Sequence, residues 1–500
     1  MICIGAENNR ENVSIDAEAR AAMCASTRAY VVAPVLRMCY TAIFNGEDGI
    51  FKSGAAAATV IYLGYQDIKP ARGITENTPQ TGGGAGGGAG GVVSVAPEIE
   101  RAIIEQTVIF IEMKSLSAGD SAGGAPVSDG DIAALKAALA GDYAKRGRAP
   151  LSILIGGAGL FVCGKDIYEA LREAGRILAG GGVVYEGLHT GALRTLAHAS
   201  PANDTAGGQN LRDAEYALSP PRKISGNRLK GKIALITGAA QGFGKGIAGE
   251  LAAEGAYVAI ADLNYEGAKK CAYEIAEAYG AGSAIAIAAN VADEASVAAM
   301  VRQTVLSYGG LDIFISNAGV LIAGALPDMS KEQFELVTSI NYTGYFLGAK
   351  HASVPMKLQH SIRESYMTDI IEINSKSGLE GSNKNFAYAG SKFGGVGLTQ
   401  SFALELVEYG IKVNAVCPGN FLDGPLWSDP DRGLFKQYLD AGKVAGAKTV
   451  ADVRRYYESR VPMKRGCTVA DVAKAILYLI EQAYETGQAL PVTGGQVMLR

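Results

Sequence analysis

Three polar residues in the second half of the chain have types and spacings that suit acid–base chemistry. Tyr388 and Lys392 are four residues apart in "YAGSK", and on a helix this spacing places both side chains on one face. Ser375 precedes them, directly after "DIIEIN", an apolar segment typical of a strand. A phenol, an ammonium and a hydroxyl gathered in this way can hold a reacting group and move a proton.

The Tyr–Lys spacing alone is not specific, because Tyr265 and Lys269 repeat it in "YEGAK". That second pair directly follows Asp262, is expected on an exposed helix and has no serine partner. The upstream serine therefore distinguishes Tyr388 and Lys392 as the candidates.

A glycine-rich turn lies further upstream, between the apolar segment "KIALITG" and an amphipathic helix. Gly238, Gly242 and Gly244 lack side chains, so the backbone can turn tightly and approach a pyrophosphate at the helix N-terminus. A tight turn without a ligand is the alternative, and the strand–turn–helix context favours the nucleotide. The glycine tract at 78–91 shows similar spacing without that context, so we interpret it as a flexible linker.

The next apolar segment ends at Asp262. A carboxylate there can accept hydrogen bonds from the adenosine ribose and repels a 2′-phosphate. Because Gln241, Leu263 and Asn264 bring no cation beside it, the sequence favours NAD over NADP.

Positioning these groups requires strands whose ends meet at one edge. From residue 229 to 500, apolar strands and amphipathic helices alternate with βαβ spacing, which predicts an α/β fold with a doubly wound parallel sheet of the Rossmann type. The predicted strands are 232–238, 257–263, 283–291, 312–319, 369–375, 411–419 and 489–495.

The chain has 500 residues, so we expect more than one domain. Residues 1–199 are predicted to form a smaller α/β domain of uncertain role that contains the linker 78–91. Residues 200–228 form a second linker, and 229–500 form the NAD-binding catalytic domain. Within the first half we predict helices at 16–40, 131–147 and 165–181 and strands at 107–113 and 151–157.

Composition excludes several classes of protein. Apolar residues make up 48% and the net charge is −4, so no basic excess suggests nucleic acid. The seven cysteines are scattered without a CxxC, which indicates reduced thiols. No apolar stretch reaches the roughly 18 residues of a membrane span, and no signal peptide is evident. We expect a cytoplasmic protein with neither a nucleic-acid nor a membrane partner.

Several motifs occur in a familiar order: "TGAAQGFG", Asp262, "NAG" at 317–319, Asn341 in "INYTGYF", Ser375, "YAGSK" and "PG" at 418–419. With these motifs, residues 229–500 resemble the short-chain dehydrogenase/reductase family. The resemblance implies an NAD-dependent oxidoreductase in which Tyr388 is the general acid/base and Ser375 holds the reacting oxygen. Lys392 would bind the nicotinamide ribose and favour the ionised phenol, and Asn341 would support a proton-relay water.

The resemblance also implies which residues bind NAD. They are Gly238, Gln241, Gly242, Phe243, Gly244, Asp262, Leu263, Asn290, Val291, Asn317, Ala318, Gly319, Tyr388, Lys392, Pro418, Gly419 and Asn420. Asn290-Val291 departs from the Asp-Val that the family more often has beside the adenine, and the amide keeps a carbonyl acceptor.

Segments such as "INSKSG", "GNFLDGPLW" and "YYESRVPMKRGC" are similar to family members that act on a hexitol phosphate. This similarity implies oxidation of sorbitol 6-phosphate to fructose 6-phosphate. A phosphate requires cations, and Lys376 adjoins the serine while Arg465 follows the variable segment 421–462. We therefore predict Ser375, Lys376 and Arg465 as substrate residues, with simple solvation as the alternative for either cation.

The first half resembles, over "LSILIGGAGLFVCGKDIYEALREAGRIL", a class II aldolase-like domain. An active aldolase of that type needs a histidine cluster for its metal. The four histidines are His189, His198, His351 and His360, and no HxH occurs. We therefore expect no metal site and a structural or oligomerisation role.

Three other functions are open at this stage: a dehydrogenase of an unphosphorylated polyol or other secondary alcohol, an NAD(H)-binding redox sensor, and a bifunctional aldolase–dehydrogenase. The four candidate catalytic residues argue against the sensor, and the histidine count argues against the aldolase. The family's tendency implies a homo-oligomer, a dimer or tetramer.

Overall fold

The structure, a computed structural model, describes the second half of the chain almost completely and short pieces of the first half. The described residues are 228–431, 433–440 and 442–498, together with 33–34, 37–38, 59–63, 108–111, 133, 135, 137, 152–155 and 159–164. The predicted linker at 78–91, most of that at 200–228, the predicted helix at 165–181, His189 and His198 lie outside these residues.

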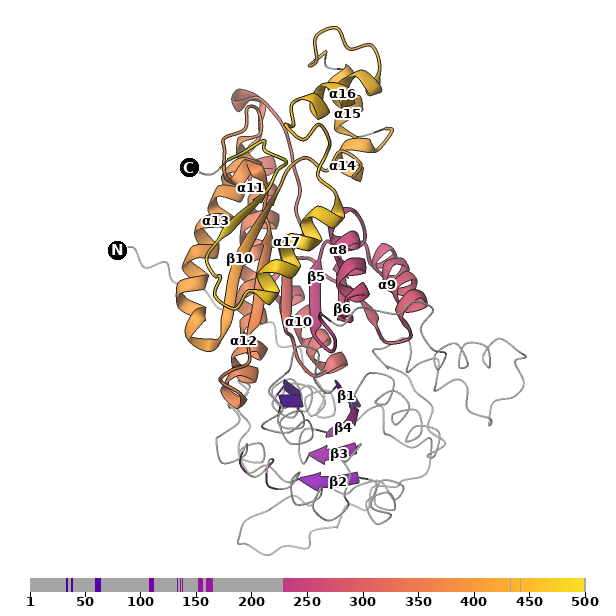
Figure 1. The fold of residues 1–500 in the computed structure, drawn as a ribbon, viewed down its shortest axis with the longest axis vertical. Coiled ribbons are helices and arrows are strands. Elements are labelled where there is room, and N and C mark those ends of the chain that lie inside the picture. Colours follow the sequence, from indigo (N-terminus) through magenta and orange to yellow (C-terminus); the bar gives the residue numbers. More distant parts are fainter. Residues whose placement is uncertain are drawn as a thin grey trace, which may run out of the picture.

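The second half is built on a seven-stranded parallel sheet, as the alternating pattern predicted (Figure 1). All seven predicted strands are confirmed, and their order in the sheet is β11-β10-β9-β8-β5-β6-β7. The strands are β5 (Ile233–Thr237), β6 (Tyr257–Asp262), β7 (Ala284–Ala288), β8 (Ile313–Ser316), β9 (Thr368–Ile373), β10 (Ile411–Pro418) and β11 (Ala489–Val492).

Helices cover both faces of this sheet, so its central strands are buried on both sides and mainly apolar. Every residue of β5, β8, β9 and β10 is buried. The chain proceeds outward from β5 to β7 and then returns to β8 on the other side of β5. This reversal creates a switch point at the carboxyl ends of β5 and β8, where sheets of this kind bind their ligands.

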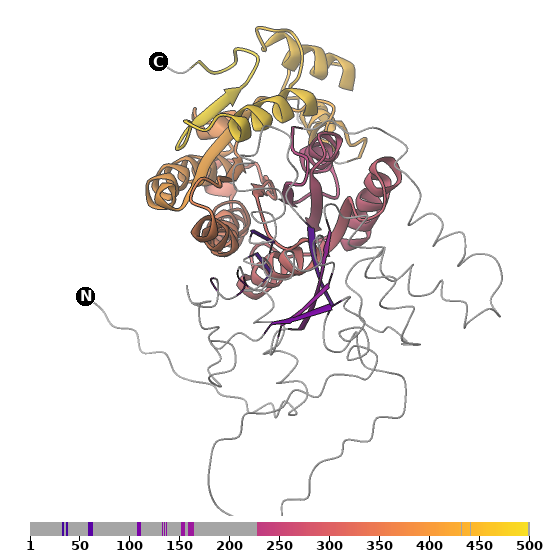
Figure 2. The ribbon, with the colours of Figure 1, turned by 60° about the horizontal axis from the view of Figure 1, so that its bottom comes forward.

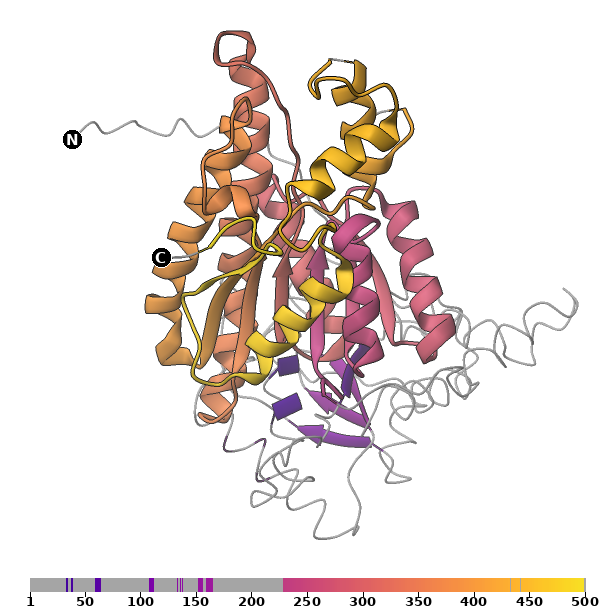
Figure 3. The same cartoon turned by 45° about the horizontal axis from the view of Figure 1, so that its top comes forward.

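Helices α8, α9 and α17 pack on one face, and α10, α12 and α13 pack on the other (Figures 1 and 3). Helix α12 approaches closely because Gly348 has no Cβ, which would lie 2.4 Å from Cζ of Phe314. The helices are α8 (Gly242–Ala253), α9 (Tyr265–Tyr279), α10 (Glu294–Tyr308), α11 (Lys331–Thr338), α12 (Gly344–Ile362), α13 (Phe386–Leu406) and α17 (Val469–Glu481). Shorter turns are η3 (Leu326–Asp328), the π-helical η4 (Ser339–Thr343), η5 (Lys376–Gly378) and η6 (Val407–Tyr409).

The segment 421–462, here called the insertion, forms a small helical unit with its own core. It contains α14 (Pro425–Ser428), α15 (Leu434–Asp440) and α16 (Val450–Ser459). The buried ring of Trp427 lies at its centre, with ring centroids of Phe435, Tyr438 and Tyr457 at 5.2, 5.8 and 4.8 Å. The insertion stands beyond the carboxyl edge of the sheet, on the side of α8 (Figures 1 and 3).

Four short strands of the first half form a separate sheet in the order β1-β4-β3-β2. They are β1 (Thr59–Leu63), β2 (Val108–Ile111), β3 (Ser152–Ile155) and β4 (Gly159–Gly164). Strands β2 and β3 fall within two predicted strands, whereas β1 and β4 were not predicted. This small sheet lies at the end of the molecule opposite the insertion, with β1 beside α10 (Figures 1 and 2).

Arg37 joins the first half to the large sheet through a buried ion pair. Its Nη1 and Nη2 lie 3.1 and 2.8 Å from the two carboxylate oxygens of Asp312, and Nη2 also donates to the carbonyl of Gly231 at 3.0 Å. Gly310 makes room for it, since a Cβ there would lie 2.9 Å from Nη1. Asp312 and Gly231 precede β8 and β5, so this contact is at the amino edge of the sheet. Among the described helices, none has the length and apolar character needed to cross a membrane.

Candidate active site

The glycine-rich turn after β5 has the shape of a phosphate cradle. Gly238 and Gly242 have φ values of +63° and +60°, which residues with a Cβ rarely adopt. A Cβ on Gly244 would lie 2.4 Å from the carbonyl oxygen of Gly238, whereas the space in front of Gly242 is open to 4 Å. Helix α8 begins at Gly242, and its unpaired N–H groups and positive dipole end lie at that open space.

Asn317, predicted as a cofactor residue, holds this turn from β8. Its Nδ2 donates to the carbonyls of Thr237 and Gly238 at 2.9 and 3.0 Å. The hydroxyl of Thr237 in turn accepts the N–H groups of Asn317 and Ala318 at 3.0 and 3.1 Å. The two strands that flank the switch point are thus tied together at their carboxyl ends.

Asp262 lies at the end of β6, and its carboxylate is oriented by backbone groups. Oδ2 accepts the N–H of Ala240, in the glycine turn, at 2.9 Å, and Oδ1 accepts the N–H of Asn264 at 2.8 Å. Each carboxylate oxygen has a further lone pair, so the group can still accept hydrogen bonds from a ribose. The neighbouring Leu263 is 77% exposed.

Asn290 and Val291, the departure from the family pattern, follow β7. Oδ1 of Asn290 accepts the N–H of Ala292 at 3.1 Å, so the amide carbonyl closes a local turn. Val291 packs against Gly344, where a Cβ would lie 3.1 Å from Cγ2 of Val291. Val291 therefore packs against the start of α12. The contact of this pair with the adenine remains a prediction.

Asn341 lies in the π-helical turn η4, a rare conformation that is frequent at functional sites. Its Oδ1 accepts the N–H of Val320 at 2.8 Å, and its Nδ2 donates to the carbonyl of Val320 at 2.9 Å. Nδ2 also lies 3.2 Å from the hydroxyl of Ser391, which donates to the carbonyl of Tyr388 at 2.8 Å. Asn341 is thereby connected to the helix that carries Tyr388.

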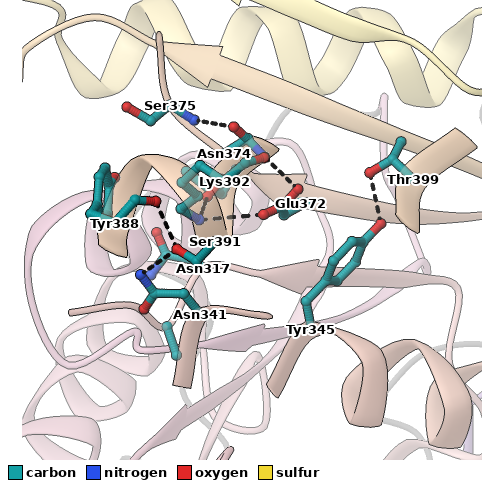
Figure 4. A network of polar contacts seen from close by, with 12 residues as sticks. Asn317, Asn341, Tyr345, Glu372, Asn374, Ser375, Tyr388, Ser391, Lys392 and Thr399 are labelled. Carbon is teal, nitrogen blue, oxygen red and sulfur yellow. Dashed lines mark hydrogen bonds and ion pairs between the residues drawn. The ribbon is translucent and has the colours of Figure 1, made fainter. Parts of the chain in front are cut away.

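Ser375, Tyr388 and Lys392 are brought into the same network (Figure 4). Tyr388 and Lys392 lie in the first two turns of α13, and Ser375 precedes η5, where its hydroxyl accepts the N–H of Ser377 at 3.1 Å. Lys392 is only 4% exposed, and its Nζ donates to the carbonyl of Ile373 at 2.8 Å. Tyr388 is half-buried.

Two residues that the sequence analysis did not single out complete this network. Glu372 is 1% exposed, and its Oε1 lies 3.4 Å from Nζ of Lys392. Asn374 Nδ2 donates to Oε2 of Glu372 at 2.7 Å and to the carbonyl of Lys392 at 2.9 Å. Burial raises the pKa of Glu372, and the charge of Lys392 and the hydrogen bond from Asn374 oppose this only in part. The sequence feature that could have indicated Glu372 is the presence of an acidic residue inside the apolar run "DIIEIN".

The predicted substrate cations have different surroundings. Lys376 is half-buried beside Ser375, and burial lowers the pKa of its ammonium while the charge of Glu380 acts in the opposite direction. Arg465 is held by Asp471, with Nη1–Oδ2 and Nη2–Oδ1 distances of 2.6 and 2.9 Å. A phosphate at Arg465 would therefore have to displace a carboxylate.

The predicted cofactor residues after β10 lie where the sheet meets the insertion. The N–H of Gly419 donates to the carbonyl of Val492 at 2.9 Å, and a Cβ on Gly419 would lie 2.9 Å from Oε1 of Gln496. Phe243 of the glycine turn stacks on Phe421 with ring centroids 4.3 Å apart. The glycine turn is therefore in direct contact with the start of the insertion.

The second Tyr–Lys pair is a surface feature, as interpreted from the sequence. Nζ of Lys269 lies 5.0 Å from the ring centroid of Tyr265 and 2.7 Å from Oε1 of Glu266 on the exposed side of α9. Neither side chain reaches the network around Ser375.

The second half of the chain is similar to known oxidoreductases. The family model described as short chain dehydrogenase matches residues 232–428. Sorbitol-6-phosphate 2-dehydrogenase of Escherichia coli (strain K12) is 39% identical over 269 residues, which are 53% of this chain and 99% of that protein. An uncharacterized oxidoreductase of Thermotoga maritima is 35% identical over 268 residues, 53% of this chain and 97% of that protein. The crystal structure of sorbitol-6-phosphate 2-dehydrogenase from Erwinia amylovora is 40% identical, covering 53% of this chain and all (100%) of that one, with a TM-score of 0.49.

The chain belongs to the short-chain dehydrogenase/reductase family, and it is an oxidoreductase that uses a nicotinamide cofactor. The glycine cradle, the oriented carboxylate of Asp262 and the N-terminus of α8 fit the pyrophosphate and ribose of such a cofactor.

Proposed function

We propose that this protein oxidises the secondary alcohol of a sugar-alcohol phosphate with NAD, converting sorbitol 6-phosphate to fructose 6-phosphate. The observation that carries the proposal is the convergence of Asn341, Ser375, Tyr388 and Lys392 at the carboxyl edge of the sheet, beside the glycine cradle. The similarity to sorbitol-6-phosphate 2-dehydrogenase over 99% of that protein's length supports the choice of substrate.

In this proposal Tyr388 removes the proton from the substrate hydroxyl. The hydroxyl of Ser375 accepts the N–H of Ser377, so its own proton is free to be donated to the substrate oxygen. The ammonium of Lys392, one helical turn from Tyr388, favours the ionised phenol and holds the nicotinamide ribose. Bound NAD supplies the hydride acceptor. Positioned proton transfer of this kind contributes roughly 10²–10⁴ to the rate.

Asn341 is proposed to hold the water that carries this proton to solvent. Its amide is fixed by both backbone groups of Val320 and by Ser391, so it cannot rotate freely. A fixed amide beside the base orients a water better than a mobile one, because the amide loses no further conformational entropy when the water binds.

A preference for NAD over NADP is proposed from the end of β6. The carboxylate of Asp262 is held in place by the N–H groups of Ala240 and Asn264, and it would repel a 2′-phosphate. The adjacent Leu263 and Asn264 are uncharged, so no cation beside the carboxylate compensates for this repulsion.

Three lysines around the site supply charge for the substrate phosphate. Lys376 adjoins Ser375, Lys384 precedes α13, and Lys443 lies in the insertion with Nζ 3.8 Å from the ring centroid of Tyr438. Burial lowers the pKa of Lys443, and the nearby charge of Lys384 adds to this effect. Within the described part of the chain, none of the three has a carboxylate within 4.0 Å. A phosphate bound beside Lys384 and Lys443 would relieve the repulsion between these two lysines.

The direct test is NADH formation by the full chain with sorbitol 6-phosphate, its stereoisomers and free sorbitol, each with NAD and with NADP. We expect turnover with NAD and a kcat/KM for sorbitol 6-phosphate at least about ten-fold above that for sorbitol, since one charge-assisted contact contributes about 1.5–3 kcal/mol. Equal turnover of the two alcohols would refute the phosphate assignment and favour an unphosphorylated polyol.

We further propose that residues 1–199 form a non-catalytic domain and that the protein is a homodimer or homotetramer. The buried contact of Arg37 with Asp312 supports a structural role for the first half.

The oligomeric state is proposed from exposed apolar side chains on two neighbouring helices. These are Phe346 on α12 and Phe393 and Leu404 on α13, which are 41, 47 and 84% exposed, and they support helix-to-helix association of two copies. Sedimentation equilibrium of the full chain measures this directly.

A further inference from the structure

Behind the side chains that face the substrate lies a second layer of buried polar groups, which contacts Lys392 from the side away from Tyr388. Glu372 Oε1 lies 3.4 Å from Nζ of Lys392, and the carbonyl of Ile373 accepts from the same nitrogen at 2.8 Å. Asn374 connects the carboxylate to the backbone of α13. The ammonium is therefore held by a charged and a neutral acceptor, and both belong to the end of β9.

The carboxylate of Glu372 is fitted closely into this position. A Cβ on Gly395, one turn after Lys392 on α13, would lie 2.4 and 2.6 Å from its two oxygens. Gly378 is similarly constrained, because a Cβ there would lie 2.0 Å from Oδ1 of Asn374. Because both glycines lack a Cβ, Glu372 and Asn374 can pack closely against the start of α13. These two residues in turn contact Lys392, so its position depends on this polar layer.

Three titratable groups face Glu372 from the neighbouring elements. They are the ammonium of Lys392, the phenol of Tyr345 and the thiol of Cys417. Tyr345 on α12 donates to or accepts from Thr399 at 3.0 Å, and burial, together with the charge of Glu372, raises its pKa. Burial and the charge of Glu372 likewise raise the pKa of Cys417 on β10 to about 12. Among the described residues, Glu372 therefore has Lys392 as its only cationic neighbour.

We propose that Glu372 is a positioning residue that fixes Lys392 and, by offsetting part of its charge, sets the pH range in which Tyr388 can act as a base. The inference rests on the proposed function, because it assigns Tyr388 and Lys392 their roles. An ammonium favours a nearby phenolate through its charge, and a carboxylate 3.4 Å behind it reduces that effect. In this proposal, Glu372 holds Lys392 in a fixed position, and the enzyme reaches full activity at a higher pH than it would without this carboxylate.

The test is the pH profile of kcat/KM for Glu372→Gln in the full chain, with the substrate that the wild type oxidises. Removing the negative charge should shift the midpoint of the acidic limb to lower pH by about one unit, which is about a ten-fold gain in kcat/KM on that limb. Glu372→Asp withdraws the carboxylate by one methylene and should shift the midpoint in the same direction by less. A purely structural role would lower kcat/KM at every pH and leave the midpoint unchanged.

The matched control is Asp369→Asn, on the same strand β9. Asp369 is also buried and also pairs with a lysine, Lys412, at 3.0 Å, but it lies at the opposite end of the strand. Its replacement should leave the pH midpoint unchanged. An unshifted midpoint in both folded Glu372 variants, or failure of both to fold, would overturn the proposal. A wild type without turnover on any polyol would instead overturn the proposed function.

Discussion

Two buried carboxylates at opposite edges of one sheet differ in how many donors they have. Asp312 precedes β8 at the amino edge, and Glu372 lies near the end of β9 at the carboxyl edge. Asp312 accepts from five groups: Nη1 and Nη2 of Arg37, the N–H of Ile233, Nε2 of Gln359 and the hydroxyl of Tyr366. Glu372 has two donors, Lys392 and Asn374.

The protonation equilibria of the two carboxylates reflect this difference. Burial raises the pKa of each carboxylate. At Asp312 the charges of Arg37 and Lys232 outweigh burial and lower the pKa to about 2, whereas at Glu372 the charge of Lys392 does not. The amino edge therefore holds a carboxylate that stays ionised above about pH 4 and joins neighbouring elements of the fold. The carboxyl edge holds an anion whose charge still influences its neighbours.

The largest expected effect is on stability, from Arg37→Met. Breaking this buried pair leaves Asp312 charged and without its hydrogen-bonded cation, so the free energy of unfolding should fall by about 3–5 kcal/mol. The kcat/KM of the folded protein should stay within about two-fold, because the proposed catalytic residues are at the other edge. Urea unfolding and initial rates measure the two quantities.

The control for Arg37 is Arg228→Met, which removes an exposed pair with Glu481 (Nε–Oε1 2.6 Å) and should cost at most about 1 kcal/mol. Adding Asp312→Asn to Arg37→Met should recover part of the loss by removing the unpaired charge. If Arg37→Met and Arg228→Met destabilise equally, the amino edge is not held by this ion pair.

Acid should weaken the amino edge by a smaller amount. The pKa of Asp312 is lowered in the folded protein, so its stabilisation is complete above the unfolded value of 3.8 and is lost as pH falls toward about 2. The loss should amount to about 2 kcal/mol.

Asp369 should have the opposite effect. Burial raises its pKa to about 6, despite the opposing charge of Lys412, so its protonation should add stability as the pH falls from about 6 to about 4.

Urea unfolding measured at one-unit steps from pH 7 to pH 2 resolves these two opposite slopes. Asp312→Asn should flatten the slope below pH 4, and Asp369→Asn should flatten the slope between pH 6 and pH 4. If Asp312→Asn loses stability with acid as steeply as the wild type, another carboxylate is responsible.

The smallest expected effect is on substrate selection, from Lys376→Ala. If Lys376 contacts the phosphate, KM for sorbitol 6-phosphate should rise about ten-fold, while KM for free sorbitol changes by less than about two-fold. Arg465→Ala is the comparison, because Asp471 already holds that guanidinium. Equal changes for both alcohols in Lys376→Ala would mean that the lysine orders the loop and does not bind the phosphate.

The strands, the glycine turn and the Tyr388–Lys392 pair could be predicted because each is indicated by residues that are close together in the sequence. Apolar runs predict all seven strands of the large sheet, and the glycine turn is recognised from the strand before it and the helix after it. Tyr388 and Lys392 lie one helical turn apart, so their spacing alone places them on one face.

The parts that escaped prediction depend on contacts between distant residues. Glu372 lies 20 residues from Lys392 and within a run that predicts only a buried strand. Arg37 lies 275 residues from Asp312, so nothing near either residue indicates the pair. The π-helical turn at Asn341 and the aromatic core around Trp427 likewise result from packing between elements.

The most direct test of the proposed chemistry is Tyr388→Phe in the full chain, with turnover and cofactor binding measured on the same preparation. Removing the phenolic oxygen should lower NADH formation from sorbitol 6-phosphate by about 10³-fold or more, because the proposed mechanism assigns the proton transfer to that oxygen. NADH binding, followed by its fluorescence, should change by less than about three-fold. Retained turnover with intact binding would contradict the placement of the chemistry at the carboxyl edge of the sheet.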